Sequence, residues 1–221
     1  MLDGQLATVS TVDLDNELEA RRAARLLALG ASGSAAELRA MDALRERGVE
    51  ARAVRVGERA PRFRLPTIGG PDIDLETLLA PGRAVLLFVC GRECGFCTAT
   101  VHAYAERHDR FRARRTALAA IAPWSPQVAA DCARPGMLAA VDSGLHVARA
   151  YGLVVDGQGI DWPGPIGHEQ AHAVGFSHRR PLAAMLVVDA DATVRHACID
   201  VDYRRRANPA DAGLAHVPGL L

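Results

Sequence analysis

Apolar residues recur at helical spacing along the first quarter of the chain, among many alanine, arginine and glutamate residues. These apolar positions are Leu18, Leu26, Leu27, Leu38, Met41 and Leu44. Gly30–Ser34 interrupts the pattern with residues that favour a turn. We therefore predict two helices between Leu14 and about Arg55, which form an N-terminal helical arm over residues 1–55.

The remaining residues, 56–221, alternate short apolar runs with helical patterns and are predicted to form one domain. Ala84–Val89 is a continuous apolar run, typical of a strand buried on both faces. Before it we predict a hairpin around a Gly-Gly-Pro turn, and after it a helix of about 18 residues through Phe111. Further elements are predicted as strands Ala117–Ile121, Met137–Val141, Ala184–Asp189 and Thr193–Ile199, helices through Val128 and over Val147–Tyr151, and an irregular region over 152–178. This order indicates an α/β fold with a central mixed β-sheet flanked by helices.

Composition narrows the class of protein. Apolar residues make up 49% of the chain, and 26 acidic residues balance 26 basic ones, all of which are arginine. The absence of lysine excludes enzymes that form a Schiff base through a lysine side chain. Because basic residues are not in excess, the composition gives no support for nucleic-acid binding. The sequence starts without an apolar signal-peptide core, and no run approaches the roughly 20 apolar residues of a membrane span. We expect a soluble, cytoplasmic protein that binds neither nucleic acid nor membrane.

The candidate catalytic residues are Cys94 and Cys97, which stand three residues apart where a buried strand becomes a helix. The unpaired N–H groups and the dipole of a helix start favour a thiolate and raise its reactivity. At this spacing a second thiol can resolve a mixed disulfide formed by the first. The pattern therefore predicts a redox-active pair, with a metal-binding knuckle or ordinary buried thiols as the alternatives.

Several segments together resemble the peroxiredoxin-like, thiol-specific antioxidant (AhpC/TSA) family of the thioredoxin fold. They read VGERAPRFRLPTIGG from Val56, AVLLFVCGRECGFC, FRARRTALAAIAPWSP, VARAYGL and MLVVDADATVRHACIDVDYRRRANPAD. The resemblance implies a thioredoxin-like domain over 56–221 and a thiol-dependent oxidoreductase that acts on a peroxide or disulfide. It implies a thiol reductant and no required cofactor. A homodimer is compatible with the resemblance, and the sequence leaves the oligomeric state open. Cys97 falls where the peroxidatic cysteine of typical peroxiredoxins stands, and Cys94 replaces their threonine.

One position departs from both related patterns. Ala183 stands where typical peroxiredoxins carry an arginine and thioredoxins a cis-proline. Arg179 and Arg180 are close enough in sequence to substitute for that arginine. Tyr203–Arg206 is a second basic segment, which fits either an anion-binding group or a surface turn.

The other cysteines have simpler interpretations. With Cys90 included, the segment has the Cys-x3-Cys-x2-Cys spacing that resembles radical S-adenosylmethionine enzymes. Those enzymes need a larger barrel of β-α repeats than the chain can supply, so we interpret Cys90 as a strand-end residue that faces the core. Cys132 and Cys198 are interpreted as small apolar core residues, with a resolving thiol as the alternative.

A histidine segment supports an alternative function. His168, His172 and His178 fit the H-E-x-x-H-x-x-G-x-x-H spacing that resembles metzincin proteases. The segment runs into a strand of the other family's pattern, so a transition metal such as copper, zinc or iron is favoured over proteolysis. Cys94 and Cys97 could complete this site. The alternative is then a metal-dependent enzyme acting on a small molecule of a specialised pathway, and a third hypothesis is a binding module with vestigial cysteines.

Overall fold

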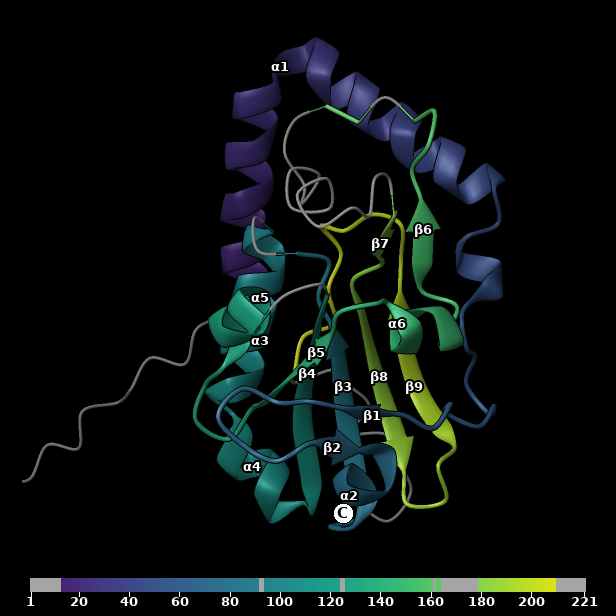
Figure 1. The fold of residues 1–221 in the computed structure, drawn as a ribbon. Coiled ribbons are helices and arrows are strands. Elements are labelled where there is room, and N and C mark those ends of the chain that lie inside the picture. Colours follow the sequence, from purple (N-terminus) through teal and green to yellow (C-terminus); the bar gives the residue numbers. More distant parts are fainter. Residues whose placement is uncertain (1–12, 92–93, 124–125, 161, 164–178, 210–221) are drawn as a thin grey trace, which may run out of the picture.

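A five-stranded mixed sheet forms the centre of the computed structural model, with strand order β5-β4-β3-β8-β9 (Figure 1). The structure describes residues 13–91, 94–123, 126–160, 162–163 and 179–209. The strands are β3 (Arg83–Phe88), β4 (Thr116–Pro123), β5 (Leu138–Asp142), β8 (Ala184–Asp189) and β9 (Val194–Ile199). The first three run parallel, whereas β8 and β9 extend the sheet antiparallel. The predicted α/β fold with a central mixed sheet is confirmed.

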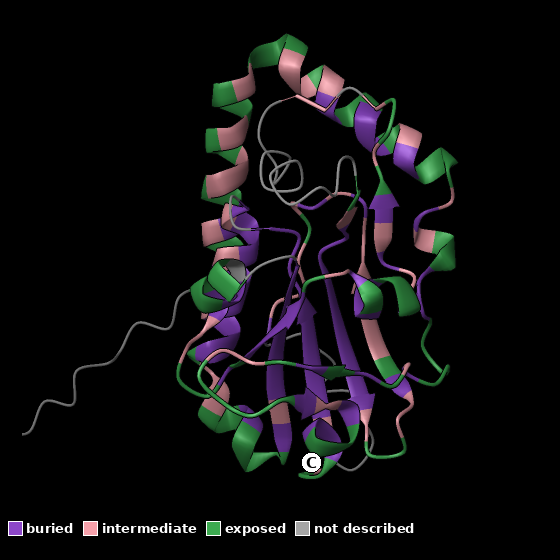
Figure 2. Ribbon diagram, viewed as in Figure 1, coloured by how far each residue is buried: buried purple, intermediate pink, exposed green. Residues whose placement is uncertain are grey.

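Strand β3 lies in the middle of the sheet and separates two apolar cores. Leu86 and Phe88 contribute to one core, and Val85 and Leu87 contribute to the other. Side chains alternate between the faces of a strand, so a strand covered on both faces needs apolar residues at every position. Figure 2 shows the result as central strands that are buried almost throughout. The continuous apolar run at Ala84–Val89 was therefore a reliable signal for this strand.

The helix expected to run for about 18 residues after the cysteines is in fact two helices. They are α3 (Gly95–Ala105) and α4 (His108–Ala113). The backbone at Arg107 has φ −101° and ψ 11°, which departs from helical geometry. This turn lets Phe111 stack on Tyr104 with 5.7 Å between ring centroids, and both side chains are fully buried. Packing of the two rings accounts for the break that the apolar pattern alone concealed.

The remaining short elements lie around the sheet. They are the predicted hairpin of β1 (Arg64–Leu65) and β2 (Ile73–Asp74), the helices α2 (Leu75–Leu79), α5 (Pro126–Cys132) and α6 (His146–Ala150), and a 3-10 helix at Glu50–Arg52. Sequence patterns missed a second antiparallel pair, β6 (Val154–Asp156) with β7 (Arg179–Pro181). Each strand of this pair has three residues, too few for a period to be recognised.

The N-terminal arm is the helix α1 (Leu14–Glu46), which bends at Gly30 and arches over one end of the sheet (Figure 1). Gly30 has φ 63°, a conformation that glycine adopts at little cost, and the bend falls at the predicted break. Leu14 and Leu18 are buried in one core, and Met41 and Leu44 in the other. The arm is thus packed into the domain. Among the described residues, no helix combines the length and apolar character needed to cross a membrane.

Candidate active site

Three cysteine sulfurs converge where β3 ends and α3 begins. The Sγ atoms of Cys90, Cys94 and Cys97 all lie within 4.8 Å of one another, and those of Cys90 and Cys97 are 3.4 Å apart. All three residues are buried. The structure therefore brings together the predicted pair. Cys90 is buried in the core just after β3, as expected, and its sulfur also belongs to the cluster.

Local backbone geometry explains how the chain gathers these thiols. Cys94 is the N-cap of α3, with extended φ −84° and ψ 92°, and its Sγ accepts the N–H of Cys97 at 3.4 Å. Cys97 lies in the first helical turn, where backbone N–H groups lack intrahelical partners. Gly91, with φ 150°, follows Cys90 in a conformation that side chains rarely allow. The end of β3 and the start of α3 therefore lie close together. The sequence predicted this position for Cys94 and Cys97, where a buried strand becomes a helix.

Among the three cysteines, Cys97 has the surroundings that favour a thiolate. Hydrogen bonds from Cys90 and Cys94 hold its pKa well below the ordinary value, and the charge of Arg206 acts in the same direction against burial. The main-chain N–H of Cys90 also donates to the Cys97 sulfur, at 3.4 Å. One sulfur therefore accepts several donors, which is the arrangement that stabilises a charged sulfur in a buried place.

The surroundings of the other two cysteines favour the neutral thiol. Hydrogen bonds to Cys94 and Cys97, together with burial, raise the pKa of Cys90 well above its ordinary value. Cys90 favours the charged form of Cys94, but the hydrogen bond that Cys94 gives to Cys97, together with burial, raises its pKa to about 12. The surroundings thus favour the charged form at Cys97 and the neutral form at Cys90 and Cys94.

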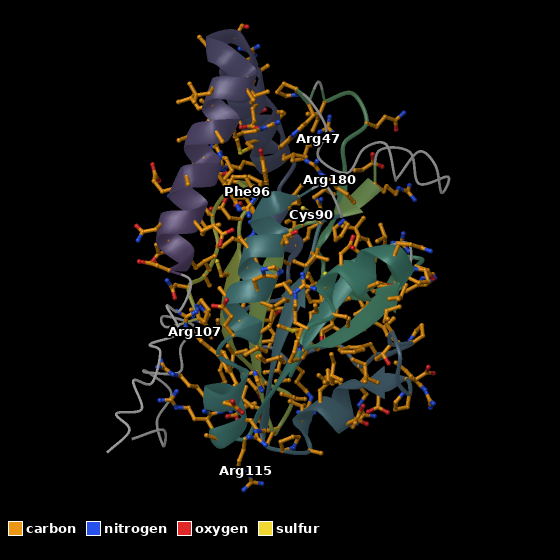
Figure 3. All side chains as sticks on the ribbon, turned by 90° about the vertical axis from the view of Figure 1, so that its left-hand side faces the viewer. Arg47, Cys90, Phe96, Arg107, Arg115 and Arg180 are labelled. Carbon is orange, nitrogen blue, oxygen red and sulfur yellow. The ribbon has the colours of Figure 1, made fainter. Side chains whose placement is uncertain are left out.

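Two arginines place positive charge at this cluster. The Nη2 atom of Arg206 lies 3.7 Å from the Cys97 sulfur and 3.8 Å from the Cys94 sulfur. Arg180 lies over the ring of Trp162 at 4.2 Å, and its charge interacts with Cys90 and Cys94. Figure 3 shows Arg180 and Cys90 at the same end of the molecule, away from Arg115. Each of the two basic segments noted in the sequence therefore has an arginine at the site, Arg180 in one and Arg206 in the other.

The arm holds the segment that carries Arg206. Glu37 of α1 is 1% exposed and accepts hydrogen bonds from Arg204 at 3.1 Å and from the hydroxyl of Tyr203 at 2.8 Å. Arg25, before the bend of α1, donates to the same carboxylate at 3.0 Å. A buried carboxylate with this many donors fixes its partners in place. Both halves of the arm therefore position the residues next to Arg206.

A pocket lies beside Cys97 and contains about 330 Å³ of space not filled by atoms, part of it open to solvent. Thr100, Ala183, Cys198 and Arg206 are among its lining residues. Ala183 is buried, and its side chain is a single methyl group at the position where the sequence resemblance places an arginine. Arg206 approaches the same sulfur from the C-terminal segment. A positive charge thus lies beside Cys97 although position 183 carries none.

The other candidate residues are distributed differently. Cys132 is buried on α5, and burial raises its pKa to about 12, which fits the expected apolar role. Cys198 is half-buried on β9 and lines the pocket beside Cys97. His168, His172 and His178 lie outside the described residues. A metal site that includes them stays a prediction.

Comparison with known proteins adds the family. The AhpC/TSA family model matches residues 56–197. No curated protein matches the chain. Similar solved structures include peroxidoxin BcpB from Mycobacterium tuberculosis, with 19% identity, coverage of 73% of this chain and 95% of that chain, and a TM-score of 0.50. Peroxiredoxin 5 from Alvinella pompejana has 17% identity, coverage of 73% and 94%, and a TM-score of 0.51.

A third similar structure is reduced Prx3 from Vibrio vulnificus in complex with hydrogen peroxide. It has 17% identity, coverage of 73% of this chain and 97% of that chain, and a TM-score of 0.52. At these identities the structures establish the thioredoxin-like fold, which confirms the predicted fold class. The chain belongs to the AhpC/TSA family, as the sequence segments indicated.

Proposed function

We propose that the protein is a thiol-dependent oxidoreductase in which the Cys97 thiolate attacks a peroxide or a disulfide. The surroundings of one sulfur carry the proposal: the Cys97 sulfur accepts the Cys90 N–H at 3.4 Å and lies 3.7 Å from the Arg206 guanidinium. A thiolate is the nucleophile in both reactions, and a nearby cation stabilises it. Membership of the AhpC/TSA family supports the same chemistry.

With a peroxide, the reaction begins at the Cys97 sulfur. The thiolate attacks one oxygen, the O–O bond breaks, and the other oxygen leaves as water or an alcohol after taking a proton. Cys97 is then a sulfenic acid. A neighbouring thiol attacks its sulfur, a disulfide forms and water leaves. An external thiol reductant supplies the two electrons that return both cysteines to the reduced state.

Two thiols lie within reach to close this disulfide. The sequence pairs Cys97 with Cys94, whose spacing is that of redox centres at helix starts. The structure adds Cys90, whose sulfur is 3.4 Å from that of Cys97. Since formation of an S–S bond needs an approach to about 2 Å, either pairing requires only a small movement. Mass mapping of the oxidised protein identifies the partner.

Substrate enters this scheme through the pocket beside Cys97. The room inside this pocket for the centre of a water-sized molecule is only about 20 Å³, which fits the reacting end of a small substrate, and the guanidinium of Arg206 lies 3.7 Å from the attacking sulfur. A cation at this place also stabilises the oxygen that leaves with negative charge. The proposed substrates are therefore small peroxides or small disulfides.

Stopped-flow measurement of the reduced protein with hydrogen peroxide tests the proposal. We expect oxidation faster than that of free cysteine, loss of this phase in Cys97→Ser, and retention in Cys132→Ser, which alters a buried cysteine outside the cluster. A small aromatic disulfide tests the second substrate class in the same way. Rates no higher than free cysteine with both substrates would refute the proposal and favour a binding module with inactive cysteines.

A further inference from the structure

We propose that Cys90, Cys94 and Cys97 form a three-thiolate site for one Cu(I) ion. The site uses the sulfurs of the proposed redox centre, but the inference does not require turnover, because it concerns the reduced protein alone. It also differs from the histidine site that the sequence indicated, since all three ligands are cysteines of the strand end and helix start. Three features support the proposal: the distances between the sulfurs, the softness of thiolate ligands and the charges around the cluster.

The separations between the sulfurs fit one metal ion. A metal–sulfur bond of about 2.3 Å around a three- or four-coordinate ion requires sulfurs about 4 Å apart. The three Sγ atoms lie within 4.8 Å of one another, and the closest pair is 3.4 Å apart. Small side-chain rotations therefore suffice to surround an ion. In an iron–sulfur cluster each cysteine binds a different iron, which separates the sulfurs further. The compact arrangement favours a single ion.

The chemistry of the ligands favours copper in its reduced state. Thiolates are soft ligands, which select Cu(I), zinc and iron–sulfur clusters among biological metals. Structural zinc sites have four protein ligands. Within the described part of the chain, the cluster consists of the three cysteines, without a histidine or carboxylate among them. Cu(I) is satisfied by three thiolates, so this ligand set suits it better than zinc.

The charges around the cluster also favour Cu(I). Binding of Cu(I) would displace the protons of Cys90 and Cys94 into solvent. Cu(I) with three thiolates then has a net charge of −2, which the two guanidinium groups of Arg206 and Arg180 would balance. Arg206 lies 3.7 Å and 3.8 Å from two of the sulfurs, and the charge of Arg180 interacts with Cys90 and Cys94. A divalent ion would leave the buried group with a net positive charge, and burial penalises uncompensated charge. The two arginines therefore discriminate against zinc.

Anaerobic titration of the reduced, full-length protein with Cu(I), in competition with a colorimetric Cu(I) chelator, tests the site. We expect one ion per chain, and copper X-ray absorption should show three sulfur ligands. Replacing a ligand should weaken binding more than altering an outer-shell partner, so Cys90→Ser should lower affinity by about 100-fold or more. Cys132→Ser is the matched control and should bind as the wild type does.

Unchanged Cu(I) affinity in Cys90→Ser, or a copper centre with two sulfur ligands in the wild type, would overturn the proposal. X-ray absorption of the wild type keeps the test valid if the variant fails to fold. Competition with Zn²⁺ tests the charge argument: Cu(I) should displace zinc, and Arg206→Gln should reduce this preference. Stronger binding of zinc than of Cu(I) would refute the choice of metal. Because binding is measured without peroxide, its failure is distinct from failure of the proposed function.

Discussion

Replacing Arg206 with glutamine should make Cys97 less acidic. The guanidinium lies 3.7 Å from the sulfur, and two unit charges about 4 Å apart interact by about 1 kcal/mol in water and about 4 kcal/mol at an effective dielectric of 20. Arg206 is half-buried, so we take about 2 kcal/mol after screening. That energy corresponds to a shift of about 30-fold toward the protonated thiol. The pH at which Cys97 becomes a thiolate should therefore rise.

The assay is the pH dependence of alkylation by iodoacetamide, with the modified Cys97 peptide quantified by mass spectrometry. Loss of the cation raises the pKa of Cys97, so the rate profile of Arg206→Gln should move to higher pH. The neighbouring Arg205 is exposed and pairs with Asp200 at 3.1 Å, which makes Arg205→Gln a matched control with an unchanged profile. Identical profiles for Arg206→Gln and the wild type would refute the electrostatic role of Arg206.

Two further predictions concern stability. Gly152→Ala should lower the free energy of unfolding by more than about 2 kcal/mol, because Gly152 has φ 69° and a Cβ there would collide with the carbonyl of Arg52. Gly48→Ala, at φ 64° with open space around it, should cost only about 1 kcal/mol in the same urea titration; equal losses would contradict the steric argument. The pKa values of Cys94 and Cys132 rise from 9.0 to about 12 on folding, so the unfolded chain loses these protons first as pH rises. Stability should fall between about pH 9 and 12, and less steeply in Cys132→Ala; parallel curves would exclude this contribution of Cys132.

The predictable parts of the molecule are those encoded by neighbouring residues. The apolar run at Ala84–Val89 and the spacing of Cys94 and Cys97 each specify a local structure, so strand and helix start were both expected. Cys90 was underestimated because its approach to Cys97 depends on the path of the turn between strand and helix. Arg206 is 109 positions from Cys97 in the sequence, and no local pattern links the two. Contacts of this kind depend on how the whole chain packs.

The features that distinguish this site lie largely outside the segment that defines the family. The family match covers residues 56–197, whereas Arg206 follows it and Glu37 precedes it. Glu37 binds the side chains of Tyr203 and Arg204, so the arm and the C-terminal segment stabilise each other near Cys97. Inside the matched segment, the uncharged Ala183 stands at the position where the sequence resemblance places an arginine. The strand and helix that present the cysteines thus lie in the family segment, whereas the cation beside them, Arg206, comes from a segment outside it.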